Sequence, residues 1–406
     1  LDRASLHLSS VDLGSDAERL AWLAGRLPEL DGSGIVYCLT QNQAEQTATW
    51  LRSQGVAAEA YTGATESDIR MQLEDRLRSN ELKALVATSA LGMGFDKGDM
   101  AFCIHLGLPP SPVAYYQQIG RAGRSIDRAA VVALPRPAED AAVWRWFESV
   151  AMPSESICRA VLDELDNGPA SIGALETLVN LGRTRLATLL NILDVDGAVE
   201  RVKGGWARTD NDWTYRHDLV DSLKQLRRAE GEQMRDWAAL STCRLRYLRS
   251  TLDDPEADDC GRCDNCTDQH LDLTVDPAEA AAAQTRLRGG DVVIEARKQW
   301  PPGMGQPKGR IPPDRQPAEG RALARLGDGG WGPIVEGLIL AADRGEAAAL
   351  PSELMPALAN VLKRWPWDAR PTWICPMPSR RRDDLIDTVA AALGALGSLP
   401  VHAALI

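Results

Sequence analysis

Between residues 34 and 134, apolar runs of strand length alternate with amphipathic stretches of helical length, and this alternation constrains the fold most strongly. The pattern predicts strands over 34–39, 56–61, 82–88, 101–106 and 129–134, and helices over 41–54 and 66–78. Strands that alternate with helices of about a dozen residues are typical of a parallel α/β sheet. We therefore predict an α/β multidomain chain whose first domain, residues 1–150, contains such a sheet.

Ligands of parallel sheets bind at the carboxyl ends of strands, and a glycine-rich segment follows the predicted strand 82–88. Gly92 and Gly94 allow a ligand to approach the backbone closely, and Asp96 offers a carboxylate. A glycine-rich strand exit is equally typical of a plain turn.

A second segment, 115–124, places Arg121 and Arg124 three residues apart. Arginines at this spacing share a helical face and suit phosphoryl transfer, because they spread positive charge over phosphate oxygens. Since Gly120 and Gly123 are poor helix formers, we interpret them as a sign of close packing against an anion. Surface ion pairs are the structural alternative.

Four of the eight cysteines, Cys243, Cys260, Cys263 and Cys266, follow the pattern C-x16-C-x2-C-x2-C. Two-residue spacers bring thiolates round one ion, and four soft ligands in a tetrahedron suit Zn²⁺. Four thiolates leave no open position, so we predict a structural Zn²⁺ site in a module over 237–275. One tight cluster among scattered cysteines favours a reducing compartment over a disulfide framework.

Residues 154–209 are predicted to form three helices and a hairpin that turns at Gly204. This order is typical of a winged helix, whose third helix and wing contact DNA. We assign a winged-helix-like domain to 151–236, with Arg183 and Arg185 as candidate DNA contacts. Packing against another protein is an equally weighted alternative.

Three segments, in order along the chain, resemble sequence motifs of superfamily 2 helicases in their RecQ form. YYQQIGRAGR (115–124) resembles motif VI, VATSALGMGFDK (86–97) resembles motif V, and GIVYCLTQNQAEQTATWLRSQGVAAEAYTG (34–63) resembles motif IV with the helix and strand after it. The resemblance identifies residues 1–150 as the second RecA-like lobe of such a helicase.

This resemblance implies catalytic roles for three residues. Arg121 and Arg124 match the motif VI arginines, with Arg124 expected at the ATP γ-phosphate. Gln117 matches the glutamine that opens the motif.

Motif V implies further contacts. Gly92, Gly94 and Asp96 match its ATP-binding positions, which couple the nucleotide to DNA, and Asp96 is expected near the ribose. Thr88 and Ser89 are expected to meet a DNA phosphate from the strand end.

RecQ proteins also have a similar four-cysteine site, preceded by a helix as here. Arg244, Arg246 and Arg249, just after Cys243, are candidate contacts to the DNA backbone. Simple solvation of these arginines is the alternative.

Neither the P-loop pattern G-x-x-x-x-G-K-[ST] nor a DExH box occurs in the 406 residues. ATP and Mg²⁺ would be held by a first lobe outside this sequence, so we expect the chain alone not to hydrolyse ATP. The first residue is Leu1, which suggests a piece of a longer protein.

A net charge of −12 excludes a uniformly basic nucleic-acid coat, so DNA must bind at local patches. No apolar run approaches the ~18–20 residues of a membrane span, and the first residues lack a signal peptide. We expect a monomeric cytoplasmic protein of bacteria, associated with the nucleoid when bound to single-stranded or partly duplex DNA.

The remainder divides into a basic Pro/Gly/Arg-rich connector, 276–330, and a segment of α/β character, 331–406. The connector is either a solvated linker or a surface on which bases stack. In the last segment, PTWICPM (371–377) followed by an Arg-rich helix resembles the ComF family of phosphoribosyltransferase-like proteins, incompletely. A RecQ-like lobe joined to such a tail resembles the bacterial RqlH clade.

The resemblance thus implies the C-terminal part of an ATP-dependent 3′→5′ DNA helicase that acts in repair or recombination. A winged-helix DNA-binding regulator with a relic motor lobe is one alternative. A nucleotide-processing transferase whose tail is the active part is another.

Overall fold

The computed structural model describes residues 2–91, 95–151, 153–179, 181–267, 270–300, 307, 309–325, 327–346, 349–379 and 381–404. Contacts within the chain divide it into two units. Unit 1 comprises Leu1–Trp144, Ala229–Val292 and Arg321–Ile406, and unit 2 comprises Arg145–Arg228 and Val293–Gly320. Residues 229–275 therefore belong to the unit of the first domain, although the sequence placed them in separate domains.

Unit 1 is built on a parallel sheet with strand order β1-β6-β5-β2-β4-β3 in the described residues. The strands are β1 (Leu6–Ser10), β2 (Ser33–Cys38), β3 (Ala58–Tyr61), β4 (Ala84–Ala87), β5 (Met100–Leu106) and β6 (Ala129–Leu134). The prediction of a parallel α/β sheet is confirmed. Strand β1 was not predicted, and its signal is the alternation of buried Leu6 and Leu8 with less buried neighbours.

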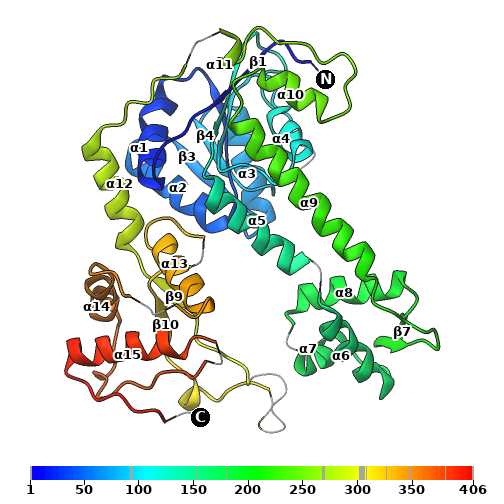
Figure 1. The fold of residues 1–406 in the computed structure, drawn as a ribbon, viewed down its shortest axis with the longest axis vertical. Coiled ribbons are helices and arrows are strands. Elements are labelled where there is room, and N and C mark those ends of the chain that lie inside the picture. Colours follow the sequence, from blue (N-terminus) through cyan, green and yellow to red (C-terminus); the bar gives the residue numbers. More distant parts are fainter. Residues whose placement is uncertain are drawn as a thin grey trace. The chain divides into compact units, whose positions relative to one another are not determined.

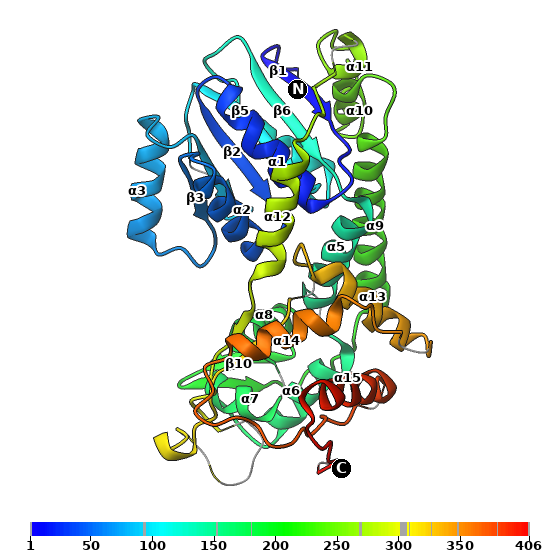
Figure 2. The same ribbon diagram turned by 90° about the vertical axis from the view of Figure 1, so that its left-hand side faces the viewer.

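Successive residues of each strand point to opposite faces, so the sheet has two cores. On β2, Ile35 and Tyr37 enter one core, and Val36 and Cys38 enter the other. The second core is covered by α1 (Asp16–Arg26), α2 (Gln41–Ser53) and α12 (Pro277–Gly289), which lie together in Figure 2. The first is covered by α3 (Ser67–Arg78), α4 (Pro112–Ile119) and the last turns of α9 (His217–Ala238), as Figure 1 shows.

The first core extends into the four-cysteine module. Trp237 on α9 is fully buried, and Leu245 and Leu248 of α10 (Arg244–Ser250) join Leu6 and Leu8 of β1 in the same cluster. The module therefore has no separate core; it completes that of the sheet.

Residues 277–289, which the sequence assigned to a connector, form α12. Ala283 is buried and Leu287 is partly buried against the core formed with α1 and α2. Just before α12, the Trp22 indole donates to the Asp272 carbonyl (2.8 Å). The interpretation of this stretch as a solvated linker is therefore wrong.

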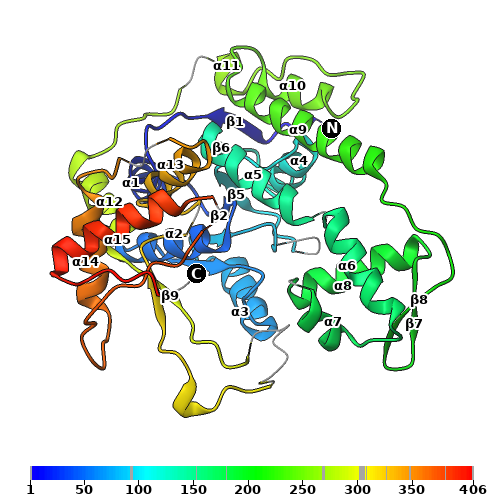
Figure 3. The same ribbon diagram turned by 60° about the horizontal axis from the view of Figure 1, so that its bottom comes forward.

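Unit 2 contains the predicted helices and hairpin, seen together in Figure 3. They are α6 (Glu155–Asp166), α7 (Ile172–Leu178), α8 (Arg183–Val195), and antiparallel β7 (Val199–Val202) and β8 (Gly205–Arg208). Leu186, Leu189, Leu190 and Leu193 form one buried face of α8 at helical spacing. Gly204 turns the hairpin with φ +93°, a left-handed conformation that favours glycine.

The C-terminal segment carries α13 (Gly332–Asp343), α14 (Leu354–Arg364) and α15 (Asp383–Gly397). The predicted strand over 371–377 is represented, among the described residues, by one parallel bridge between Ile374 and Val401. The remaining elements are η1 (Leu27–Glu29), α5 (Pro137–Ala151), α11 (Asp264–Thr267), β9 (Val292–Ile294), η2 (Pro313–Arg315) and β10 (Gly320–Ala322). None of the helices in the described ranges combines the length and apolar character that crossing a membrane requires.

His105 on β5 makes a testable contribution to stability. It is fully buried, and its Nε2 lies 2.9 Å from Gln118 Oε1. Burial lowers its pKa to about 4, whereas an unfolded histidine titrates near pH 6.5. Because the unfolded chain then binds the proton more readily, this residue makes the free energy of unfolding fall by about 3 kcal/mol as the pH drops from about 6.5 to 4.

Urea denaturation of the wild type and His105→Gln between pH 7 and pH 4 measures this contribution. The variant should lose less stability over that range than the wild type, while His270→Gln, at an exposed position, should follow the wild type. Buried Asp140, whose pKa is raised to about 6 by burial, acts with the opposite sign in all three proteins and cancels in the comparison. Parallel profiles for wild type and His105→Gln would contradict the argument.

Candidate functional site

The segment after the carboxyl end of β4 offers one accessible hydroxyl. Thr88 is buried, and its Oγ1 accepts a hydrogen bond from the Ala90 backbone (3.4 Å). Ser89 beside it is exposed. Of these two predicted phosphate contacts, Ser89 is the more accessible, and Gly92 and Gly94 lie outside the described residues.

The arginine-bearing segment meets the residues that follow. Arg124 Nη1 lies 2.7 Å from Asp96 Oδ1, and Arg121 Nη1 donates to the Phe95 carbonyl at 3.2 Å. The side chains of Arg124 and Asp96 remain 39% and 66% exposed, so a ligand can reach both. The structure thus brings together Arg121, Arg124 and Asp96, which the sequence placed in two separate motifs.

Helix α4 and the loop that follows it are held at both ends. Ser111 caps the start of α4 by accepting from the Ala114 backbone (3.2 Å). At its end, Arg3 Nη1 donates to the carbonyls of Gly120 (2.5 Å) and Ala122 (3.1 Å). A cation at a helix C-terminus satisfies carbonyls that the helix leaves free. Arg3 therefore fixes the position of the backbone that carries Arg121 and Arg124.

Gly123 is required for a reason other than the predicted one. Its φ is +68°, and a Cβ there would lie 2.5 Å from Ser5 Oγ. The Gly123 backbone N–H donates to the Met100 carbonyl (2.9 Å), and Ser5 Oγ donates to the Gly123 carbonyl (2.6 Å). The interpretation of this glycine as packing against an anion is wrong, because the atoms it approaches belong to Ser5, just before β1, and to the first residues of β5 and β6.

The side chains around Arg121 divide between solvent and core. Gln117 is exposed on α4, whereas Gln118 points inward to His105. Arg121 Nε is buried without a hydrogen-bond partner among the described residues. Burial also raises the pKa of the Tyr37 phenol, although the neighbouring Arg121 guanidinium opposes this shift. The inner side of Arg121 is therefore a dry, polar environment beneath the site.

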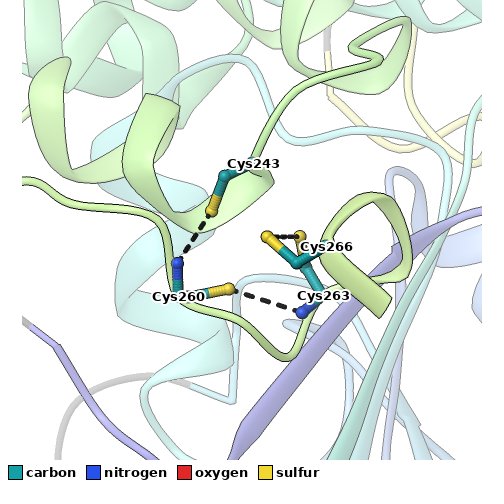
Figure 4. Close-up of side chains that lie close together, drawn as sticks. All are labelled: Cys243, Cys260, Cys263 and Cys266. Atoms are coloured by element: carbon teal, nitrogen blue, oxygen red, sulfur yellow. Dashed lines mark hydrogen bonds between the residues drawn. The ribbon is translucent and has the colours of Figure 1, made fainter. Parts of the chain in front are cut away.

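The four predicted metal ligands converge. The Sγ atoms of Cys243, Cys260, Cys263 and Cys266 all lie within 4.8 Å of one another (Figure 4). A Zn–S bond of about 2.3 Å in a tetrahedron places the sulfurs about 3.8 Å apart. The cluster therefore fits one Zn²⁺ with only small adjustments and leaves no ligand position open.

Backbone N–H groups point at two of the sulfurs. Cys243 caps α10, and its Sγ accepts from the backbone of Arg246 (3.4 Å) and Cys260 (3.2 Å). Cys260 Sγ accepts from the Cys263 backbone (3.4 Å). Such donors and a helix N-terminus stabilise thiolates, the form that binds metal. The chemistry of the donor set is thus that of a structural zinc centre.

Sequence reasoning missed residues that anchor this cluster to β1 and to the segment after α9; one of them, Arg262, donates from Nε to the Leu6 carbonyl of β1 (3.2 Å). Asp264 Oδ2 accepts from the Ser10 backbone at the end of β1 (3.1 Å). Asn265 Nδ2 donates to the carbonyls of Leu240 (2.7 Å) and Thr242 (2.8 Å). Their only sequence signal is their place inside the CGRCDNC run.

Two of the three arginines after Cys243 are not available to DNA. Arg244 Nε lies 2.6 Å from Asp264 Oδ1, with 6% of its side chain exposed. Arg249 Nε lies 2.6 Å from Asp254 Oδ2, with 10% exposed. The prediction that these two contact DNA phosphates is therefore corrected, because each is buried and bound to an internal carboxylate. Arg246 is 44% exposed and pairs with a surface aspartate.

In unit 2, Arg183 and Arg185 lie exposed on the first turn of α8. Neither forms an ion pair with another residue in the described part of the chain. Because both guanidinium groups are exposed and unpaired there, an external anion can reach them. They do not stabilise the helix itself, since positive charge at a helix N-terminus is unfavourable.

Residues 19–125 match the family described as helicase conserved C-terminal domain. The chain is 35% identical over 151 residues to the ATP-dependent DNA helicase RecQ of Pasteurella multocida, covering 37% of this chain and 23% of that protein. It is 38% identical over 120 residues to RecQ of Haemophilus influenzae, covering 30% and 19%. Among solved structures, the Escherichia coli DEAD-box protein SrmB covers 36% of this chain at 21% identity with a TM-score of 0.32.

The matched range, residues 19–125, contains the arginine pair and the central strands of the parallel sheet, and it is a helicase C-terminal domain. The identities to the two bacterial relatives make this portion of the chain similar to the matching portion of RecQ helicases. The chain matches about a fifth of the length of those relatives, which are much longer.

Replacing one cysteine tests the metal centre. Cys243→Ser should abolish stoichiometric zinc and lower thermal stability, because three thiolates and a hydroxyl hold Zn²⁺ less tightly than four thiolates. Zinc per chain, measured by elemental analysis of purified protein, should be near one in the wild type. Cys375→Ser, outside the cluster, is the control and should keep its zinc. Equal zinc in Cys243→Ser and the wild type would refute the ligand set.

Proposed function

We propose that this chain is part of an ATP-dependent DNA helicase of the RecQ type that moves 3′→5′ and acts in repair or recombination. The observation that carries the proposal is the meeting of Arg121 and Arg124 with Phe95 and Asp96, in a lobe of this family. Binding of ATP would come from a P-loop lobe, whose sequence pattern is absent from these 406 residues.

In this mechanism the exposed Arg124 leaves Asp96 and turns to the γ-phosphate when ATP brings the lobes together. A guanidinium there stabilises the charge that spreads over the phosphate oxygens in the transition state. Asp96, once released, is free to bind the ribose. Arg121, tied to the Phe95 carbonyl, transmits the movement to the segment after β4. Gln117, exposed on α4, is the third group of the proposed nucleotide site.

DNA contacts in this proposal come from both units. Ser89, with Thr88 beside it, meets a phosphate at the carboxyl end of β4, and Arg183 and Arg185 meet phosphates from the first turn of α8. The unit 2 helices and hairpin would then act as a winged-helix-like DNA-binding module. Zinc has a structural role, and Arg246 is the exposed arginine through which its module could touch DNA.

The remaining expectations complete the proposal. The protein would be a monomer in the bacterial cytoplasm, located at the nucleoid when bound to single-stranded or partly duplex DNA. The C-terminal segment would be a ComF-like, phosphoribosyltransferase-like appendage, as in the RqlH clade; α15 at the predicted helix supports this.

Arg124→Ala tests the arginine finger in a protein in which a P-loop lobe precedes this chain. Its ATP turnover in the presence of single-stranded DNA should fall by roughly 10³-fold or more, because arginine fingers contribute about that much. Affinity for DNA should stay unchanged. Arg128→Ala, an exposed arginine of the same loop, is the matched control and should retain turnover. The 406-residue chain alone should show no turnover at all.

The outcome separates the helicase from its first alternative. If the longer protein hydrolyses ATP and DNA stimulates it, residues 1–150 are half of a motor. If the longer protein is inert but binds DNA, the winged-helix regulator with a relic lobe is the better description, and substantial turnover in Arg124→Ala would remove the finger assignment.

The salt dependence of DNA binding tests Arg183 and Arg185. For single strands, each phosphate contact contributes about −0.7 to the slope of log K against log salt. The double variant Arg183→Gln/Arg185→Gln should therefore flatten the slope by about 1.4. Arg159→Gln/Arg216→Gln, which removes two exposed arginines already paired with Glu155 and Asp196, should leave the slope unchanged. An unchanged slope in the first pair would argue against these contacts.

A further inference from the structure

A line of buried rings crosses the first core from the sheet to α9. The ring centroids of Tyr37 and His105 are 5.2 Å apart, those of His105 and Tyr115 are 4.8 Å apart, and those of Tyr115 and Trp237 are 4.6 Å apart. Tyr115 and Trp237 are fully buried. Each ring is therefore packed against its neighbours in the line, at distances where aromatic pairs attract, and the two inner rings, His105 and Tyr115, have a ring on either side.

At one end of this line lies the four-cysteine module. The Trp237 indole N–H donates to the Arg244 carbonyl (3.2 Å), and Arg244 Nη1 donates to the Trp237 carbonyl (2.9 Å). The Arg244 guanidinium also lies 5.4 Å from the indole centroid. Asp264, next to the ligand Cys263, fixes this guanidinium. Trp237 is thus held in place by residues that the metal centre organises.

The ring next to Trp237 in this line, Tyr115, belongs to α4, the helix that leads into the arginine pair. Tyr115 is fully buried between His105 of the sheet and Trp237 of α9. One turn further on, Gln118 binds His105 (2.9 Å), so the sheet also contacts α4 there. Moving Trp237 away would free one side of the helix over the turn that precedes Arg121.

We infer that Trp237 and Tyr115 are positioning residues through which the four-cysteine module sets the place of Arg121 and Arg124. The expected effect on ATP turnover rests on the proposed function. The expected effect on the position of α4 and its following loop does not depend on that function. The positioning acts through contact between the rings and not through the Tyr115 hydroxyl, because that hydroxyl is buried without a hydrogen-bond partner among the described residues. Tyr115→Phe should therefore be silent, whereas loss of the Trp237 ring should not.

Hydrogen exchange on the 406-residue chain tests the structural part. Trp237→Ala should raise exchange in the peptide 112–126 more than in α3, which covers the same face of the sheet. Trp237→Phe and Tyr115→Phe should leave that peptide protected, and zinc per chain should stay at the wild-type value in all three. Trp50→Ala, which removes an equally buried indole from the opposite face, is the matched control.

Two exchange results would overturn the inference. One is that peptide 112–126 stays as protected in Trp237→Ala as in the wild type. The other is that exchange rises there no more than it does in Trp50→Ala or in α3, because the effect is then general loss of stability. If Trp237→Ala does not fold, Trp237→Leu replaces it under the same criteria.

Turnover in the longer protein tests the functional part. Trp237→Ala should lower kcat for ATP by about 100-fold, the typical effect of misplacing a catalytic group by about 1 Å, with KM for ATP nearly unchanged. Trp237→Phe should restore kcat to within about threefold. If the exchange rises as expected but kcat does not change, the positioning role is wrong while the proposed function stands. If the wild-type protein has no ATPase activity, the proposed function fails, and the exchange experiment alone decides the coupling.

Discussion

The buried ion pair between Arg244 and Asp264 is the interaction on which the rest of unit 1 depends. Both side chains are almost fully buried, and together they bind the end of β1, the last turn of α9 and the cysteine cluster. Removing one partner of such a pair leaves an uncompensated buried charge, which typically costs about 3–5 kcal/mol. The pair is tolerated because every element around it supplies a backbone acceptor or donor. The four-cysteine module is for this reason part of the lobe's own architecture.

The arrangement of the strands explains why the segment after β4 and the arginine-bearing loop after α4 lie together. Residues 95–99 lead into the amino end of β5, and the loop after α4 leads into the amino end of the adjacent β6. The Gly123 backbone N–H donates to the carbonyl of Met100, the first residue of β5, so Asp96 meets Arg121 and Arg124 there although some 25 residues separate them along the chain. Arg3, near the start of the chain, holds the loop by donating a hydrogen bond to the Gly120 carbonyl. These hydrogen bonds thus hold the long, flexible side chains of Arg121 and Arg124 at a fixed position on the sheet.

The sequence was informative where one physical signal dominates. Apolar runs marked β2 to β6, and cysteine spacing marked a cluster that the fold assembles. It failed where the outcome depends on which side chains the fold brings into contact. Nothing in Arg244 or Arg249 distinguishes a buried arginine from a solvated one until Asp264 and Asp254 are placed beside them. Residues 277–289 were assigned to a connector although alanine is the best helix former, because the stretch has only a narrow apolar face, where Ala283 and Leu287 pack on the core.

Because unit 1 consists of separate segments of the chain, it cannot complete its folding until late in translation. Tyr115 and Leu6 emerge early, but the groups that cover them, Trp237 and Leu248, are synthesised more than a hundred residues later. At about 5–20 residues per second, the part of the sheet face that α9 and α10 later cover remains exposed for on the order of ten seconds, while unit 2 can already fold around its own core. Premature termination or slow translation in that interval would leave an apolar surface open, the state in which chaperones and aggregation compete for a chain.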